Sequence, residues 1–117
     1  MRPRDEIQVY LCRESIDMRK SIDGLSVLVE QVLELDLFAP HLFAFCNRKR
    51  DKIKVLYWEG SGFVLWYKRL EKDRFPWVGE GSEAVRSLTG RELNWLLDGI
   101  DVFAMKPHGA LSYETVL

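Results

Sequence analysis

Two runs of β-type residues, separated only by the tetrapeptide EGSG, constrain this fold more than any other feature of the chain. The runs are KIKVLYW at 52–58 and FVLWYKRL at 63–70, and together with the glycine-bearing turn they predict a β-hairpin. A two-residue loop of Gly60 and Ser61 would fix the register. The cross-strand pairs on one face are then Trp58–Phe63, Leu56–Leu65, Lys54–Tyr67 and Lys52–Arg69. A longer loop would shift this register and turn one strand over.

Three further segments have the length and the composition of strands. They are EIQVYLC at 6–12, LFAFC at 42–46 and, with a less regular pattern, residues 83–88. The polar turn NRKRD at 47–51 joins the second of these to the hairpin. Residues 42–70 therefore predict a meander of three antiparallel strands.

Two segments show helical signals. Asp17 can cap a helix that begins at Met18, and apolar residues then recur at helical spacing as far as Asp36. Thr89 and Glu92 form a capping-box pattern just before a second apolar stripe. The pattern as a whole predicts an α+β fold: an antiparallel sheet of about four strands, with a central three-strand meander and two helices packed on one face.

The length of 117 residues predicts a single domain, 1–117, with a core at about 6–100 and an irregular C-terminal tail at 101–117. No apolar run approaches the ~20 residues of a membrane span, and the N-terminus lacks the apolar segment of a signal peptide. We therefore expect a cytoplasmic protein without membrane contact. Cys12 and Cys46 are expected to be reduced, buried thiols, since disulfides are rare in the cytosol.

The formal net charge of −1 hides an asymmetry along the chain. Residues 44–76 carry 9 cations and 4 anions, whereas residues 1–43 carry 5 and 8, and residues 77–117 carry 3 and 6. The chain is thus not a basic protein that coats any polyanion. A polyanion bound by it should meet the central, basic segment.

Cations of the central segment are expected to meet at one edge of the sheet, because the second strand of the predicted hairpin ends beside the turn at 47–51. The candidate nucleic-acid-binding residues are Arg48, Lys49, Arg50, Lys52, Lys68, Arg69, Lys72 and Arg74. A phosphate backbone would supply the anions that this edge lacks. Trp66 and Tyr67 are candidates for stacking on a base if the strand is single. The alternative is a solvated edge whose lysines only prevent aggregation.

A second basic signal lies in SIDMRKSID, where Arg19 and Lys20 fall in the first turn of the predicted helix. Free N–H groups and two cations would suit a phosphate there, as a secondary site. The alternative is a local ion pair, such as Arg19 with Asp23.

Signatures of catalysis are absent from the sequence. It has no glycine-rich phosphate loop and no nucleophile elbow. No strand ends in the converging carboxylates that a two-metal nuclease or transposase needs, and the cysteines and histidines lack zinc-ligand spacing. We therefore expect a protein that is not an enzyme and that uses no metal or cofactor.

Three segments resemble a known family. They are YLCRESIDMRKSIDGL, FCNRKRDKIKVLYWEGSGFVLWYKRLEKDRFPW and LTGRELNWLLDGID. Together they are similar to the small accessory protein encoded by the second open reading frame of insertion-sequence family sixty-six. That protein is often called TnpB-type, a label shared with an unrelated RNA-guided nuclease. The resemblance implies a bacterial mobile-element protein that acts beside a separate transposase with an Asp-Asp-Glu catalytic site, and it supplies no catalytic residue to carry over.

The leading hypothesis is a non-catalytic accessory protein of a bacterial transposable element that contacts DNA through the basic edge, at element ends or on a single strand. The alternative is a protein–protein adaptor that docks on the transposase without contacting DNA itself. Its docking surface would be the aromatics near Trp58 and Phe63, or the tail. A nuclease is a third hypothesis, and it requires a metal site that the sequence does not show.

Overall fold

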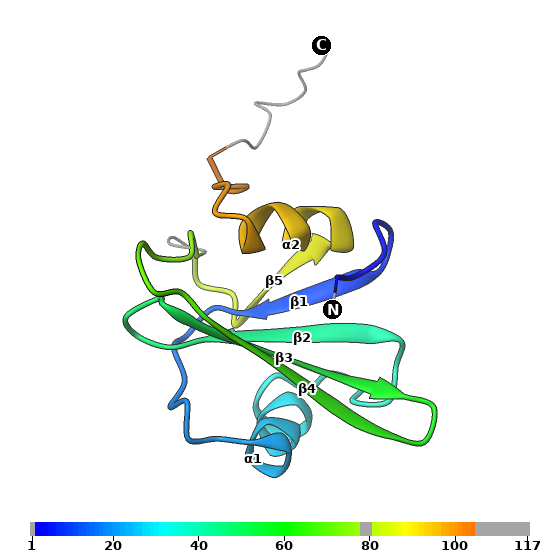
Figure 1. Ribbon diagram of the computed structural model, residues 1–117. Coiled ribbons are helices and arrows are strands. Elements are labelled where there is room, and N and C mark those ends of the chain that lie inside the picture. Colours follow the sequence, from blue (N-terminus) through cyan, green and yellow to red (C-terminus); the bar gives the residue numbers. More distant parts are fainter. Residues whose placement is uncertain (1, 78–80, 105–117) are drawn as a thin grey trace.

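Five strands form one mixed sheet in the computed structural model, which describes residues 2–77 and 81–104 (Figure 1). The strands lie in the order β4-β3-β2-β1-β5. Their bounds are β1 Gln8–Cys12, β2 His41–Cys46, β3 Lys52–Glu59, β4 Gly62–Arg69 and β5 Val85–Thr89. The helical elements are α1 Ile22–Val27, the π-helical turn η1 Leu28–Val32, and α2 Gly90–Leu97. The α+β class is confirmed, and the sheet is larger than predicted.

The sheet is not purely antiparallel, so that part of the prediction is wrong. β1 and β2 pair in parallel, with Val9 beside Leu42 and Leu11 beside Ala44. Parallel neighbours need a long crossover connection, and here the chain between β1 and β2 provides it through α1 and η1. The other three pairings are antiparallel, including the predicted meander of β2, β3 and β4.

The helices cover opposite faces of the sheet, and the expectation of two helices on one face is also wrong (Figure 1). Leu93, Leu96 and Leu97 of α2 pack on the face that carries Val9 and Leu11. On the other face, Leu25 and Val29 pack against Phe43 and Phe45. The reason is the composition of β2, where five successive residues are buried. An uninterrupted apolar strand needs cover on both sides.

The hairpin of β3 and β4 has the predicted register throughout. Trp58 pairs with Phe63, Lys54 with Tyr67, and Lys52 with Arg69. Gly60 has φ 61°, the left-handed region that the first position of a type II′ turn requires and that glycine occupies without strain. The two-residue loop therefore confirms the predicted pairing.

The first helix begins later than predicted. Asp17 accepts a hydrogen bond from the Arg19 amide, 2.9 Å, and its carbonyl oxygen accepts one from the Lys20 amide, 3.0 Å. The residues that were expected to begin the helix form this turn instead. Ser21 is therefore the N-cap, and Ile22 is the first helical residue. The second helix begins as predicted, with the Thr89–Glu92 capping box formed in both directions.

The core continues past residue 100. Gly99, with φ 89°, ends α2, and the chain then turns back so that Val102 is buried in the α2-side cluster. The irregular tail predicted from residue 101 lies mostly outside the described residues, at 105–117. Among the residues described, no helix has both the length and the apolar composition of a membrane span.

Candidate nucleic-acid interface

Two backbone hydrogen bonds close one end of the sheet. The Leu70 amide donates to the carbonyl of Asp51, 2.8 Å, and the Phe75 amide donates to the carbonyl of Arg50, 2.7 Å. The segment after β4 is therefore tied to the turn between β2 and β3. Residues 48–52 and 69–74 meet there, as the sequence predicts.

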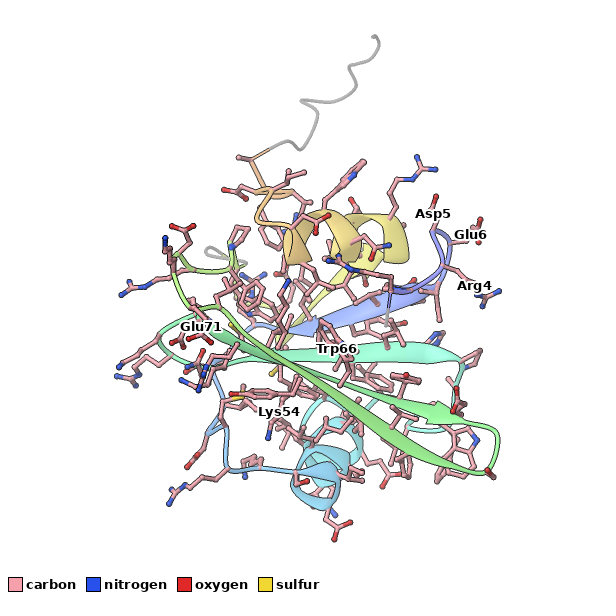
Figure 2. The ribbon with its side chains drawn as sticks, viewed as in Figure 1. Arg4, Asp5, Glu6, Lys54, Trp66 and Glu71 are labelled. Carbon is pink, nitrogen blue, oxygen red and sulfur yellow. The ribbon has the colours of Figure 1, made fainter. Side chains whose placement is uncertain are left out.

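Five of the eight candidate cations are exposed at this end of the sheet, and we call them the basic end. They are Arg48, Lys49, Arg69, Lys72 and Arg74. A surface hollow of about 620 Å³ lies among them, lined by Lys49, Lys72 and Arg74 and also by Asp51 and Asp73. Figure 2 shows Glu71, which belongs to the same segment, at the opposite end of the molecule from Arg4. The cations thus share one end of the fold.

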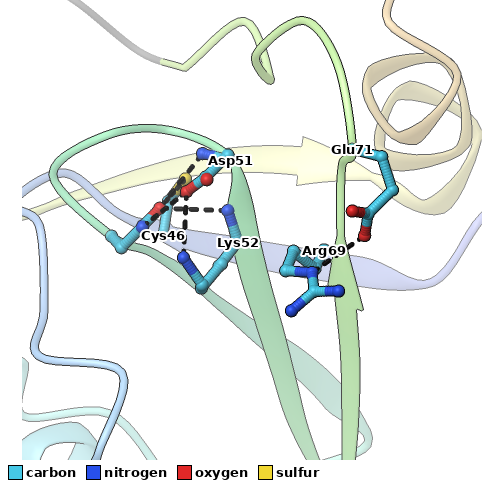
Figure 3. A network of polar contacts seen from close by, with 6 residues as sticks. Cys46, Asp51, Lys52, Arg69 and Glu71 are labelled. Atoms are coloured by element: carbon cyan, nitrogen blue, oxygen red, sulfur yellow. Dashed lines mark hydrogen bonds and ion pairs between the residues drawn. The ribbon is translucent and has the colours of Figure 1, made fainter.

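Asn47 shapes the turn that presents Arg48 and Lys49. Its side-chain oxygen accepts hydrogen bonds from the amides of Asp51, 3.1 Å, and Lys52, 3.0 Å. Its side-chain amide donates to the Asp51 carboxylate, 2.7 Å. This hydrogen bond lowers the pKa of Asp51 and keeps it ionised. Figure 3 shows the resulting cluster beside Cys46, with the Arg69–Glu71 pair on the neighbouring strand.

Arg50 is directed into the fold and supports the turn. Its guanidinium carbon lies 6.0 Å from the centre of the Trp77 ring, and one of its nitrogens is buried without a hydrogen-bond partner. The indole N–H of Trp77 donates in turn to the carbonyl of Cys12, 3.0 Å.

Cys46 is the residue that precedes the turn, and burial raises the pKa of its thiol to about 11. Both cysteines are buried free thiols, as predicted.

Lys52 and Lys68 are also only partly exposed. The side chain of Lys52 is 30% exposed, and its ammonium group lies 3.5 Å from the Asp51 carboxylate. Lys68 extends along the α2 face, where its ammonium group donates to the carbonyl of Leu97, 3.3 Å. The alternation of side chains along β4 accounts for this, because Lys68 and Arg69 must point to opposite faces.

Arg69 pairs with Glu71 at 2.8 Å, and both side chains are well exposed, at 58% and 73%. An exposed pair of this kind contributes little to stability, because water and salt screen it. The guanidinium of Arg69 can therefore leave Glu71 and bind another anion with only a small loss of free energy.

The two stacking candidates lie on different faces. Trp66 packs against the α2-side core, whereas Tyr67 is 48% exposed on the α1 side. The ammonium group of Lys54 lies 5.7 Å from the centre of the Tyr67 ring and donates to the carbonyls of Met18 and Lys20, both at 2.7 Å. Of the two aromatics, Tyr67 has the more exposed ring.

Arg19 and Lys20 do not lie in the first turn of a helix, so the predicted placement of the secondary phosphate site is wrong. Arg19 instead forms a two-pronged pair with Asp17, at 2.6 and 2.9 Å. This is a local ion pair, although with Asp17 rather than with Asp23. It lowers the pKa of Asp17 to about 2.

The other end of the hairpin carries aromatic side chains. The rings of Phe38, Trp58 and Phe63 contact one another, with centroids 4.9 to 5.6 Å apart. We call these three residues the aromatic end. Phe38 is 55% exposed. Sequence reasoning named Trp58 and Phe63 but missed Phe38, because Phe38 precedes Pro40 in a segment without periodicity.

Comparison with known proteins identifies the family. A family model described as IS66 Orf2 like protein matches residues 7–107. The chain belongs to the IS66 Orf2-like family. The matched residues include the basic end and the aromatic end. Membership of this family implies an accessory protein of transposition.

Two relatives of the IS66 Orf2-like chain come from Sinorhizobium fredii strain NGR234. The uncharacterized protein y4hO is 33% identical over 95 residues, which cover 81% of this chain and 82% of the relative. The uncharacterized protein y4jC is 29% identical over 101 residues, which cover 85% of this chain and 84% of the relative. No solved structure gives a significant match.

In this IS66 Orf2-like protein, the exposed cations of the basic end are suited to binding an anion. Within residues 2–77 and 81–104, no three His, Cys, Asp or Glu side chains are grouped closely enough to hold a metal ion. Two carboxylates beside the basic end already have partners, because Asp51 accepts from the Asn47 amide and Glu71 pairs with Arg69. The basic end presents exposed guanidinium and ammonium groups on a backbone that is held by the two hydrogen bonds described above.

Proposed function

We propose that this protein is a non-catalytic, cytoplasmic accessory factor of transposition that contacts DNA through its basic end and assists a separate transposase. The observation that carries the proposal is the closure of the sheet by the Leu70–Asp51 and Phe75–Arg50 hydrogen bonds. It brings two basic segments, distant in the sequence, onto one surface of a chain whose overall charge is −1.

Charge balance at this surface supports the proposal. The two segments, 48–52 and 69–74, hold seven cations against three carboxylates, and five of the cations are exposed. Like charges held together on a sheet are unfavourable unless an anion joins them. The spaced phosphates of DNA would relieve this repulsion, and the release of their counterions would favour binding.

The test is fluorescence anisotropy of labelled duplex and single-stranded DNA with the purified protein, over a series of salt concentrations. If the five exposed cations each contact a phosphate of duplex DNA, the log–log slope should be roughly −4 to −5. Tighter binding of the single strand would favour stacking on Tyr67. The absence of binding even at low salt would refute the DNA contact.

A second candidate function, a protein adaptor that docks on the transposase, is favoured by the aromatic end. Phe38, Trp58 and Phe63 form a partly exposed apolar surface at the tip of the hairpin, away from the cations. Clustered aromatic residues are common anchors of protein interfaces. Co-purification with the transposase after nuclease treatment distinguishes the two functions, because an adaptor would keep its partner and a DNA-bridged complex would lose it.

A further inference from the structure

β4 is an edge strand whose outer backbone is unpaired. Of the two edge strands, β4 has eight residues and no proline, whereas β5 has only five. Long edge strands tend to pair with other chains, and proteins usually shorten or block them. In the described part of the chain, no loop or side chain forms a hydrogen bond to the outer side of β4. This edge is therefore available for strand addition.

The geometry of β3 determines which residues of β4 face outward. The Asn47 amide donates to the Lys52 carbonyl, 3.2 Å, so the backbone of Lys52 is directed toward β2. Backbone direction alternates along a strand, so Ile53, Val55 and Tyr57 face β4. Their partners are Lys68, Trp66 and Val64. The residues of β4 that direct N–H and C=O groups outward are thus Phe63, Leu65, Tyr67 and Arg69.

The charges along the hairpin select the direction of an added strand. Glu59 lies at the tip of the hairpin beside the aromatic end, while Arg69 and Lys72 lie at the basic end. A neighbouring β4 that runs antiparallel places each Glu59 near the basic end of the other copy. A parallel neighbour would set basic end against basic end, which is unfavourable.

We propose that two copies of this protein pair through antiparallel β4 strands about a two-fold axis at Trp66, which joins their sheets into one. In this register Trp66 faces Trp66 of the second copy as a non-hydrogen-bonded pair, where side chains approach most closely. Phe63 faces Arg69 of the second copy, an aromatic–cation contact. An isologous pairing of this kind closes after two copies and leaves no free β4 edge.

This dimer would hold its two basic ends at opposite ends of the joined sheet. If the proposed function is correct, one dimer contacts two DNA segments. That consequence rests on the proposed function, whereas the pairing itself does not, because it is tested without DNA.

The test is sedimentation equilibrium of the full chain, free of DNA, for the wild type and for two variants of one residue. Tyr67→Pro removes an outward N–H that the internal ladder does not use, so the fold should be retained. Tyr67→Thr keeps that N–H and serves as the matched control. We expect dimers for the wild type and for Tyr67→Thr, and monomers for Tyr67→Pro with an unchanged circular dichroism spectrum.

Mild oxidation of Trp66→Cys tests the register, because a non-hydrogen-bonded antiparallel pair lies within disulfide reach. Ser87→Cys on the exposed face of β5 is the control. We expect a covalent dimer only for the Trp66 variant. A wild type that remains monomeric at every concentration, or a dimer that persists in Tyr67→Pro, would overturn the proposal. So would a monomer whose β4 edge instead takes up a peptide of the transposase.

Discussion

The ammonium group of Lys68 lies 3.3 Å from the carbonyl oxygen of Leu97, the last residue of α2. A helix C-terminus has unpaired carbonyl groups and a partial negative charge, so a cation is stabilising there. Arg69, the next residue, points to the opposite face and is exposed. Two adjacent cations of one strand therefore differ in role: Lys68 holds α2 to the sheet, and Arg69 faces solvent.

Lys68→Met should lower the free energy of unfolding by about 1 kcal/mol, because it removes the cation that accompanies the end of α2. Chemical denaturation measures this change. Arg69→Met is the matched control on the neighbouring residue, and it should reduce the salt slope of DNA binding by about 1 while affecting stability less. Equal losses of DNA affinity in the two variants, without a loss of stability in Lys68→Met, would contradict this division of roles.

The double variant Lys72→Gln, Arg74→Gln should bind DNA more weakly and reduce the salt slope by about 2, because each lost cation removes about one phosphate contact. The double variant Arg4→Gln, Arg91→Gln makes the same change of net charge at the other end of the molecule, where Figure 2 shows Arg4 and Asp5 and where Arg91 pairs with Asp5 at 3.1 Å. Anisotropy titrations compare the two. If both variants weaken binding alike, the effect is one of net charge and the basic end is not the contact surface.

Stability should fall as the pH rises from about 9 to 11, because burial raises the pKa of the Cys46 thiol from 9.0 to about 11. In this interval the unfolded chain has lost the thiol proton while the folded chain keeps it, so deprotonation favours unfolding. Denaturation midpoints measured at several pH values check this expectation. In Cys46→Ala the fall over this interval should be shallower, and an unchanged profile would show that other groups cause it.

Gly90→Ala should destabilise the fold by about 3 kcal/mol or more, because an added Cβ would overlap the carbonyl oxygen of Arg4 and approach the Cγ2 atom of Ile7 to 2.8 Å. The N-terminal segment would have to move away from the start of α2. Gly62→Ala is the control, since a Cβ there meets nothing within 4 Å. Thermal melts of both variants provide the comparison, and similar stabilities would argue against the close packing at Gly90.

Local patterns in the sequence were sufficient to predict the hairpin and the second helix. A two-residue loop leaves one register for β3 and β4, and the Thr89–Glu92 box marks where α2 begins. The same patterns predicted that the basic segments lie side by side, because the second strand of a hairpin ends beside the start of the first. These features depend on residues that are close in sequence, and so they could be read directly.

Features that depend on distant residues were not predictable in this way. The parallel pairing of β1 and β2 follows from the crossover through α1, and the run of Leu42 to Cys46 was a signal of cover on both faces that we did not use. The contact of Lys68 with Leu97 depends on where α2 crosses the sheet. Nothing in the order of the residues shows which of two adjacent cations will lie under a helix.

The position of β1 has a consequence for synthesis in the cell. Gln8 pairs with His41 on one side and with Thr89 on the other, so β1, which is made before the other four strands, is enclosed by β5, which is made after them. Until β5 and α2 emerge, a nascent chain carries an apolar strand with one open edge and one uncovered face. Such a chain is exposed to aggregation, and its sheet is complete only when β5 pairs with β1. Any truncation before residue 85 would therefore remove β5, the antiparallel neighbour of β1, and α2, which covers one face of that strand.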